Sequence, residues 1–396
     1  MAVQTQQATV PAKPPVWNDP RYRAIFYQAL VLMGVVGFGV YLVQNTLTNL
    51  ETRGIASGFD FLGRTAGFSI GESLIPYSEE LSYGRAFLVG LLNTLLVAAA
   101  GVVLATIIGF AIGIARLSSN WLLSKLAAVY IEVLRNVPVL LQIFFWYFAV
   151  LRAVPSPRES LSFLDSFFLN KRGLYLPAPV FEAGFWMIST AFVGAIIAVV
   201  VIVRWARRRQ ELTGQQFPVF LSSVGLIVGL PLLAAIVTGF PLSWNYAELK
   251  GFNFQGGIVL TPEFMALLVA LSMYTASYIA EIVRAGIMAV SHGQTEAAGA
   301  LGLRPGPTLR LIIIPQALRV IIPPLTSQYL NLTKNSSLAA AIAYPDLVLV
   351  FAGTTLMQTG QAVEIIAITM AVYLFLSLVI SAFMNWYNKK MALVER

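Results

Sequence analysis

Several residue types on which soluble enzymes depend are scarce in this sequence of 396 residues. It contains no cysteine, which excludes disulfides, thiolate metal sites and cysteine nucleophiles. Its single histidine, His292, excludes a metal cluster built from histidines. Only 11% of the residues are charged, against roughly 25% in an ordinary soluble domain, so polar groups cannot cover a globular surface. These shortages exclude a water-soluble enzyme.

Long apolar runs take the place of the missing charges. Apolar residues make up 58% of the chain, and the mean hydropathy is +0.76. A helix needs about 20 such residues to cross a bilayer, because each adds about 1.5 Å. Eight stretches approach this length, at about 24–43, 86–115, 126–151, 183–203, 219–240, 264–283, 320–343 and 363–387. The sequence therefore predicts an all-α polytopic membrane protein with about eight transmembrane helices.

Basic residues predict the direction of these helices. Lys and Arg residues outside the spans number 16 on the side of the N-terminus and 8 on the other side. Because basic loops remain in the cytoplasm, both termini are predicted to be cytoplasmic. The net charge of +8 then indicates orientation in a lipid bilayer, not nucleic-acid binding. Arg204, Arg207, Arg208 and Arg209 are expected to contact lipid headgroups.

The segments outside the spans show little pattern. Residues 1–20, rich in Gln, Thr, Ala and Pro, are typical of a disordered cytoplasmic tail. The external segments 44–85, 152–182 and 241–262 show no strand ladder. We expect them to form loops and short surface helices.

A predicted cytoplasmic loop at residues 291–315 has the most specific pattern. Thr295 is expected to cap a short helix that starts at Glu296, whose carboxylate suits a helix N-terminus. Gly302 is expected to end this helix in the left-handed conformation, and the two prolines that follow it to stop any continuation. The loop thus presents a short helix that can dock into a groove of a partner protein.

The spacing in this loop resembles a known family. Glu296-Ala297-Ala298, then Gly302, then Ile312-x-Ile314-Pro315 resemble the EAA loop of binding-protein-dependent ABC importer permeases, with Ile314 where Leu is usual. Residues 90–96, 132–142 and 332–338 resemble the subfamily that imports polar amino acids, of which the histidine and glutamate permeases are examples. The length and layout are similar to the enlarged general L-amino acid and glutamate/glutamine/aspartate/asparagine permeases of Gram-negative bacteria.

The resemblance implies a division of the chain into a five-helix permease core and additions. The core lies at 86–151 and 263–390, and it includes a cytoplasmic coupling helix in loop 291–315. An extra transmembrane helix lies at 21–45, a periplasmic loop at 46–85, and an insertion with two further transmembrane helices at 152–262. The residues implied to couple the chain to an ATPase are Glu296, Ala297, Ala298, Gly302 and Pro315.

The resemblance also implies partners. It implies an inner-membrane permease that imports L-amino acids, polar or acidic ones foremost, and works with two copies of an ABC ATPase subunit. A homologous second permease, or a second copy of this chain, and a periplasmic solute-binding protein complete the assembly. No P-loop pattern occurs in the chain, so ATP and Mg are expected on the ATPase subunit, with no cofactor, metal or catalytic residue on this chain.

Charged and polar residues inside the predicted spans are candidates for a substrate path, because they are costly in lipid. The candidates are Arg135, Asn136, Gln142, Lys334, Asn335 and Ser336. The structural alternative for Arg135 is an ion pair with Glu132, three residues earlier on one helical face, and the alternative for Lys334 is a side chain that reaches the headgroups. Glu281 and Arg284 have the same spacing and are expected to form a structural pair. Pro138 is expected to kink or break its helix.

Two other classes of protein compete with an ATP-driven importer. A secondary amino acid transporter driven by an ion gradient often shows inverted repeats with matched broken helices, and no convincing repeat is present. A membrane scaffold or channel has no need of the loop at 291–315. Both alternatives therefore fit the sequence less well.

Overall fold

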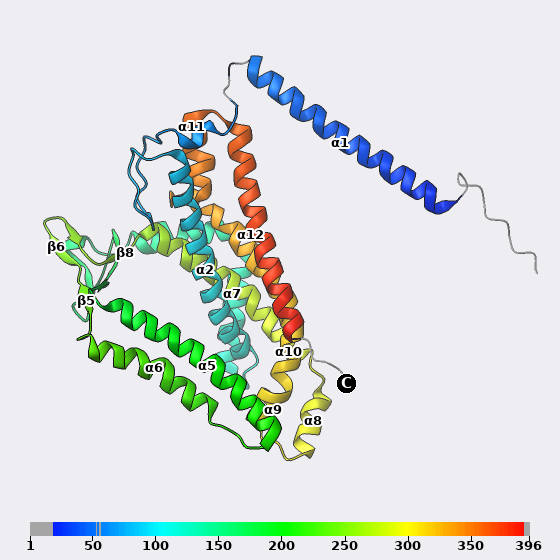
Figure 1. Cartoon of the computed structure of the whole chain (residues 1–396), viewed down its shortest axis with the longest axis vertical. Coiled ribbons are helices and arrows are strands. Elements are labelled where there is room, and N and C mark those ends of the chain that lie inside the picture. The colour runs from blue at the N-terminus through cyan, green and yellow to red at the C-terminus, as the bar shows by residue number, and fades with distance from the viewer. Residues whose placement is uncertain (1–18, 53, 55–56, 392–396) are drawn as a thin grey trace, which may run out of the picture. The chain divides into compact units, whose positions relative to one another are not determined.

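The computed structural model describes residues 19–52, 54 and 57–391, so most of the predicted tail at 1–20 lies outside the described residues. The chain divides into two compact units. Unit 1 contains residues 1–91 and 347–375, and unit 2 contains residues 92–346 and 376–396. Two of the three boundaries fall within helices α2 (Tyr83–Arg116) and α12 (Ala362–Met391) (Figure 1), and the third lies between Asp346 and Leu347.

Most of the predicted spans are single helices. Besides α2 and α12, these are α1 (Pro20–Thr52), α5 (Phe185–Thr213), α6 (Val219–Val237), α7 (Pro262–Met288) and α10 (Ile314–Asn335) (Figure 1). Within the described residues, seven helical segments are long and apolar enough to cross a membrane, or eight if one bent pair counts as a span. The number and the helical form of these segments confirm the prediction of an all-α polytopic membrane protein with about eight transmembrane helices.

The bent pair is the third predicted span, which starts at α3 (Trp121–Asn136). Val137 and Pro138 then interrupt the helix, and α4 (Val139–Phe144) continues into the π-helical η3 (Phe145–Leu151). The two halves are bent by 107°. Since proline has no N–H to donate and clashes with the preceding turn, the break predicted at Pro138 is confirmed.

Helix α7 forms the centre of unit 2. It packs against α3, α4, α10 and the 3-10 helix η6 (Ser336–Ile342), and it buries Leu267, Leu271 and Ile279 completely. Helix α2 approaches α7 closely at Gly109, where an added Cβ would lie only 2.6 Å from the Cβ of Ile279. These contacts fix the α7 helix, which leads into the loop at 291–315.

The core of unit 1 joins the loop that precedes α2 to two helices. Phe61, in the 3-10 helix η2 (Asp60–Gly63), stacks on Phe351 with 6.1 Å between ring centroids. Phe351 lies in the π-helical η7 (Val348–Thr355), which continues into α11 (Leu356–Thr359). Together they form a short apolar helix, Val348–Thr359, that sequence reasoning missed. The backbone N–H of Gly58 donates to the Glu364 carboxylate at 2.7 Å, which ties the loop to α12.

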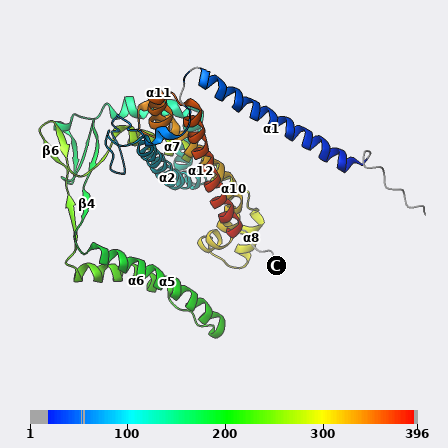
Figure 2. The same ribbon diagram turned by 45° about the horizontal axis from the view of Figure 1, so that its top comes forward.

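The expectation that segments 152–182 and 241–262 form only loops and surface helices is wrong. They contain eight strands, all paired antiparallel (Figure 2). Four strands form a sheet in the order β1-β2-β3-β8, from β1 (Leu161–Phe163), β2 (Phe167–Asn170), β3 (Gly173–Leu176) and β8 (Ile258–Leu260). Two further pairs are β4 (Ala178–Phe181) with β5 (Leu242–Asn245), and β6 (Glu248–Lys250) with β7 (Asn253–Gln255).

The length of these strands explains why the sequence conceals them. Each strand has three or four residues, which is too short for an alternating pattern to emerge. The pair β3 and β8 also joins segments far apart in the chain, with Leu174 opposite Leu260. Helices α5 and α6 lie between these segments in sequence and are paired side by side (Figures 1 and 2). The antiparallel pairing thus closes the base of the α5–α6 hairpin.

Candidate functional site

The loop at 291–315 begins with helix α8 (His292–Ala300), which starts four residues earlier than expected. Ser291 occupies the N-cap position, so Thr295 is a residue of the first turns and not the cap. Glu296 and His292 are in contact, with 3.0 Å between Oε1 and Nδ1, and both side chains are exposed. Of the two predicted alanines, Ala298 is buried and Ala297 is exposed. The prediction that Thr295 caps the helix is wrong, because residues 292–295 form an additional turn of helix after Ser291.

Gly302 ends the α8 segment as predicted. Its φ of +73° lies in the left-handed region that favours glycine. The turn allows the Leu303 N–H to donate to Ala298 O at 3.0 Å, which satisfies a carbonyl that the helix end leaves free. Leu301 beside it is 80% exposed, so the turn presents an apolar side chain next to the helix.

As predicted, helix α8 does not continue through the two prolines, but a new helix that the sequence did not predict begins at the first of them. Pro305 is the first residue of α9 (Pro305–Thr308), where no N–H is needed. The π-helical η5 (Leu309–Ile313) joins α9 to α10, and Pro315 lies in the first turn of α10. A hydrogen bond of 3.4 Å from Gln316 to Gln294 connects α10 to α8. The loop is thus an ordered hairpin between two spans.

Two predicted path residues stabilise the break in the third span. The Gln142 side-chain amide donates to Leu134 O and Val137 O, both at 2.9 Å, and Gln142 is only 5% exposed. The Asn136 amide donates to Glu132 O at 2.7 Å. The bond to Leu134 O satisfies a carbonyl that the end of α3 leaves unpaired, because Pro138 has no N–H to donate. Asn136 and Gln142 thus bond to the backbone at the break, and their place in a substrate path stays a prediction.

Arg135 lies on Tyr278 and not on Glu132. Its guanidinium carbon is 5.0 Å from the Tyr278 ring centroid, within the range of a cation–π contact. The described residues contain no ion pair between Arg135 and Glu132, so the predicted pairing is wrong. The Glu132 carboxylate is instead 3.5 Å from the Asn136 amide. Arg135 is exposed, and among the described residues it forms no ion pair.

Tyr278 belongs to a polar stripe on α7 that sequence reasoning missed. Its hydroxyl is 3.2 Å from that of Tyr274, and Tyr130 on α3 donates to Met273 O at 2.8 Å. The signal in the sequence is the spacing of Tyr274, Tyr278 and Glu281, which places all three on one helical face. The stripe therefore faces α3 and its Arg135.

Glu281 and Arg284 form the predicted pair near the end of α7. Nε of Arg284 lies 3.1 Å from each carboxylate oxygen of Glu281. Arg116 and Arg135 also contribute a positive potential at this carboxylate. Among these three arginines, Arg284 is the one in direct contact with Glu281.

The second predicted polar group lies where α10 changes to the 3-10 helix η6. Lys334 is exposed, with no ion pair in the described part of the chain. Ser336 is buried and its hydroxyl donates to Thr333 O at 2.7 Å, so it supports the change of helix type. Asn335 is partly exposed at the last position of α10. Because α4 packs on η6, the two breaks lie in the same part of unit 2.

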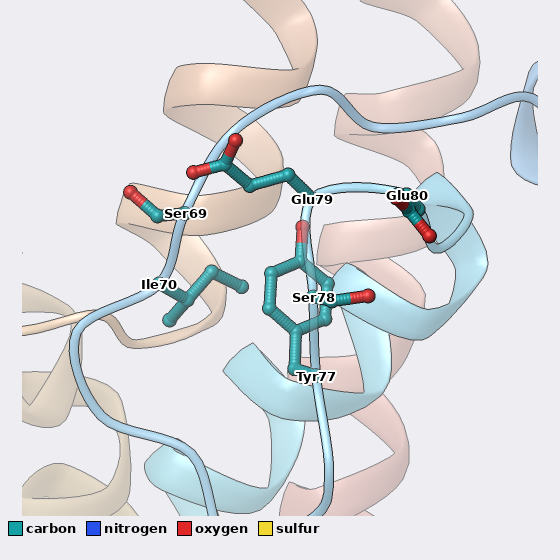
Figure 3. A pocket seen from close by; sticks show the side chains of 6 residues that line it. All are labelled: Ser69, Ile70, Tyr77, Ser78, Glu79 and Glu80. Carbon is teal, nitrogen blue, oxygen red and sulfur yellow. The ribbon is translucent and has the colours of Figure 1, made fainter.

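Unit 1 contains an open pocket of about 530 Å³ on the loop that precedes α2. It is lined by Ser69, Ile70, Tyr77, Ser78, Glu79 and Glu80. Figure 3 shows the Glu79 carboxylate reaching toward Ser69, while Glu80 points away from it. Burial and the nearby Glu79 carboxylate raise the pKa of Tyr77, whose hydroxyl donates to Phe68 O at 2.9 Å. The pocket is acidic and hydrogen-bonding, and the sequence did not single it out.

Comparisons with known proteins agree with this architecture. Residues 212–393 match the family described as "Binding-protein-dependent transport system inner membrane component". The chain is 58% identical to the general L-amino acid transport system permease protein AapQ of Rhizobium johnstonii, over 96% of this chain and 94% of that protein. It is 57% identical to the putative amino-acid ABC transporter permease protein YhdX of Escherichia coli, over 96% of each chain.

A third relative is named for four amino acids. The chain is 44% identical to the glutamate/glutamine/aspartate/asparagine transport system permease protein BztB of Rhodobacter capsulatus, over 96% of each chain. Among solved structures, an amino acid ABC transporter with histidines is 21% identical with a TM-score of 0.45, over 78% of this chain and 95% of that chain. Since the relatives match over nearly their whole length, the chain belongs to the permease subunits of binding-protein-dependent amino-acid ABC importers, in the enlarged group that contains these three proteins.

Proposed function

We propose that this chain carries L-amino acids into the cytoplasm and couples that movement to ATP hydrolysis on a separate subunit. The observation that carries the proposal is helix α8, an exposed helix of nine residues held between α7 and α10 and closed by the left-handed Gly302. A rigid, exposed helix between two spans can transmit a conformational change of a partner subunit to the transmembrane helices. Relatives that transport amino acids support the choice of cargo.

The assembly that we propose has two ABC ATPase subunits, a second permease and a periplasmic solute-binding protein. The second permease is a homologue or another copy of this chain. ATP and Mg bind to the ATPase, and this chain holds no cofactor. The chain lies in the inner membrane with both termini in the cytoplasm, as the excess of basic residues on that side supports.

The proposed coupling surface combines the exposed parts of the loop. Glu296, Ala297 and Leu301 are exposed, whereas Ala298 packs inward and fixes the helix. An apolar side chain beside a carboxylate suits a groove with an apolar floor and a basic rim. Gly302 and Pro315 hold the helix at its two connections. Movement of α8 then reaches α7 directly, because only three residues separate these helices.

The substrate path that we propose passes Arg135. An exposed guanidinium within a span cannot face lipid at low cost, so it faces protein or water. The Tyr278 ring holds it from one side and leaves its N–H groups available for a bidentate contact with the α-carboxylate of an amino acid. Lys334, at the neighbouring change of helix type, is the second cation of the path, with Asn335 beside it. Because every amino acid carries that carboxylate, this mode of recognition fits a broad substrate range.

Uptake by proteoliposomes containing the purified complex tests the function. With the binding protein and labelled glutamate or glutamine outside, uptake is expected only when ATP is present inside. Arg135→Gln and Lys334→Gln are each expected to lower uptake several-fold while all subunits still co-purify. Uptake driven by a proton or sodium gradient without ATP would contradict the coupling. Wild-type uptake by both variants would return Arg135 and Lys334 to structural roles.

A further inference from the structure

We propose that the free end of the α5–α6 hairpin is a binding site for the phosphate group of an anionic phospholipid. The hairpin contains four arginines, all within residues 204–209, and a single acid, Glu211. The proposal concerns this addition to the permease core and does not depend on which substrate the chain carries.

The length of the hairpin places these arginines at the membrane boundary. The first 19 residues of α5, before Arg204, contain no charged residue, and all 19 residues of α6 are likewise uncharged. Nineteen helical residues span about 28 Å, close to the thickness of the hydrocarbon core. Arg204 and the residues after it therefore begin where the lipid headgroups begin.

Burial shows which way the arginines face. The only buried residues of α5 are Ala195 and Ala206, which are separated by eleven residues and so lie on one side of the helix. Arg204 and Arg208 lie four residues apart on the opposite side, with Arg207 next to them. All three side chains are exposed. The face that packs on α6 thus leaves three guanidiniums directed outward.

These three guanidiniums have no acidic partner. Within residues 19–52, 54 and 57–391, the side chains of Arg204, Arg207 and Arg208 form no ion pair or hydrogen bond. Guanidinium groups present planar N–H forks that match phosphate oxygens. Several of them within one helical turn provide enough donors for a phosphodiester with a net negative charge.

The fourth arginine shows that this end of the hairpin is ordered. Gly214, at φ +69°, ends α5 and turns the chain so that Gln215 Oε1 accepts from Arg209 at 2.7 Å. The Arg209 guanidinium lies 5.3 Å from the Trp205 ring centroid, and Trp205 packs edge-on against Phe217, also at 5.3 Å. Aromatic rings of this kind are typical of the membrane interface. The turn is therefore a fixed platform beside the outward arginines.

A lipid is the occupant that this position favours. Apolar side chains along both helices remain exposed, among them Val193 and Ile197 on α5 and Val228 on α6. In a membrane these faces contact acyl chains, so a headgroup phosphate is the anion nearest to the arginines. A free phosphate ion would offer the same oxygens without the acyl chains.

Native mass spectrometry of the detergent-purified complex tests the site, with phosphatidylglycerol as the probe and phosphatidylcholine as the uncharged reference. The wild type is expected to retain phosphatidylglycerol in preference to phosphatidylcholine. The triple variant R204Q/R207Q/R208Q is expected to bind it roughly 100-fold more weakly, since each basic residue near an anionic surface contributes about fivefold. The matched control R158Q/R172Q/K250Q removes three positive charges from the strand region and is expected to bind like the wild type.

Single variants protect the test from a change of topology, because each keeps three of the four arginines that orient the hairpin. Arg204→Gln, Arg207→Gln and Arg208→Gln are each expected to weaken binding about fivefold. Wild-type binding by the triple variant, or by all three single variants, would overturn the proposal. Displacement of the lipid by millimolar inorganic phosphate would show a free-anion site instead. If the triple variant lost the ATPase subunit but bound lipid like the wild type, the arginines would contact a protein, and this result would also overturn the proposal.

Discussion

At the scale of single residues, the left-handed Gly302 offers the most direct test of coupling. An added Cβ at Gly302 would meet no atom within 4 Å, so only backbone strain opposes a side chain there. That strain is about 1–2 kcal/mol for a residue such as Leu. Gly302→Leu is expected to displace the end of α8 and to reduce co-purification of the ATPase, while membrane insertion stays normal. Coupled uptake would fall with it.

Two further variants separate strain from bulk at this turn. Asn adopts the left-handed conformation more readily than Leu, so Gly302→Asn is expected to retain most ATPase binding. Gly299 lies inside α8 with equally open surroundings, and Gly299→Ala is expected to behave like the wild type. Normal ATPase recovery and normal uptake with Gly302→Leu would contradict the docking role.

Tyr278 allows a second test at this scale, because its ring and its hydroxyl make different contacts. Tyr278→Phe keeps the ring beneath Arg135 and loses only the contact with Tyr274. Tyr278→Leu loses the ring as well. We expect uptake near the wild-type rate for Phe and several-fold lower for Leu, with ATP hydrolysis little changed in both. The ratio of amino acid transported to ATP hydrolysed measures this, and equal ratios for the two variants would contradict it.

At the scale of elements, the break between α3 and α4 depends on one buried amide. Gln142→Leu removes both hydrogen bonds to the backbone carbonyls and leaves these acceptors unpaired. Each unsatisfied buried group costs about 1–3 kcal/mol, so a lower thermal unfolding midpoint is expected for the purified complex. Gln210→Leu, at an exposed position of α5, is the control and is expected to leave the midpoint unchanged. Equal midpoints for both variants would show that the break has other support.

The elements also show what sequence patterns can and cannot predict. Long apolar runs identified the spanning helices, because 20 residues provide a strong signal, and Pro138 identified the break. The strands escaped notice since three or four residues provide almost no pattern. Side-chain partners depend on neighbouring helices, which explains why Arg135 contacts Tyr278 although Glu132 lies at the right spacing. The cap of α8 was misplaced because two hydroxyl residues, Ser291 and Thr295, precede Glu296.

At the scale of the whole molecule, the absence of cysteine makes the proposed topology directly measurable. Single cysteines can be introduced without removing native ones. Ser119, between α2 and α3, and Ser243, in β5, are both exposed.

Because the loop with Ser119 belongs to the side of the membrane that carries the excess of basic residues, Ser119→Cys is expected to resist a membrane-impermeant maleimide in intact spheroplasts. Ser243→Cys, on the side of the strand region, is expected to react. Lysed cells provide the control, since both variants should then react. Reaction of Ser119→Cys alone in intact spheroplasts would reverse the orientation and place α8 on the outside, where no cytoplasmic ATPase can reach it.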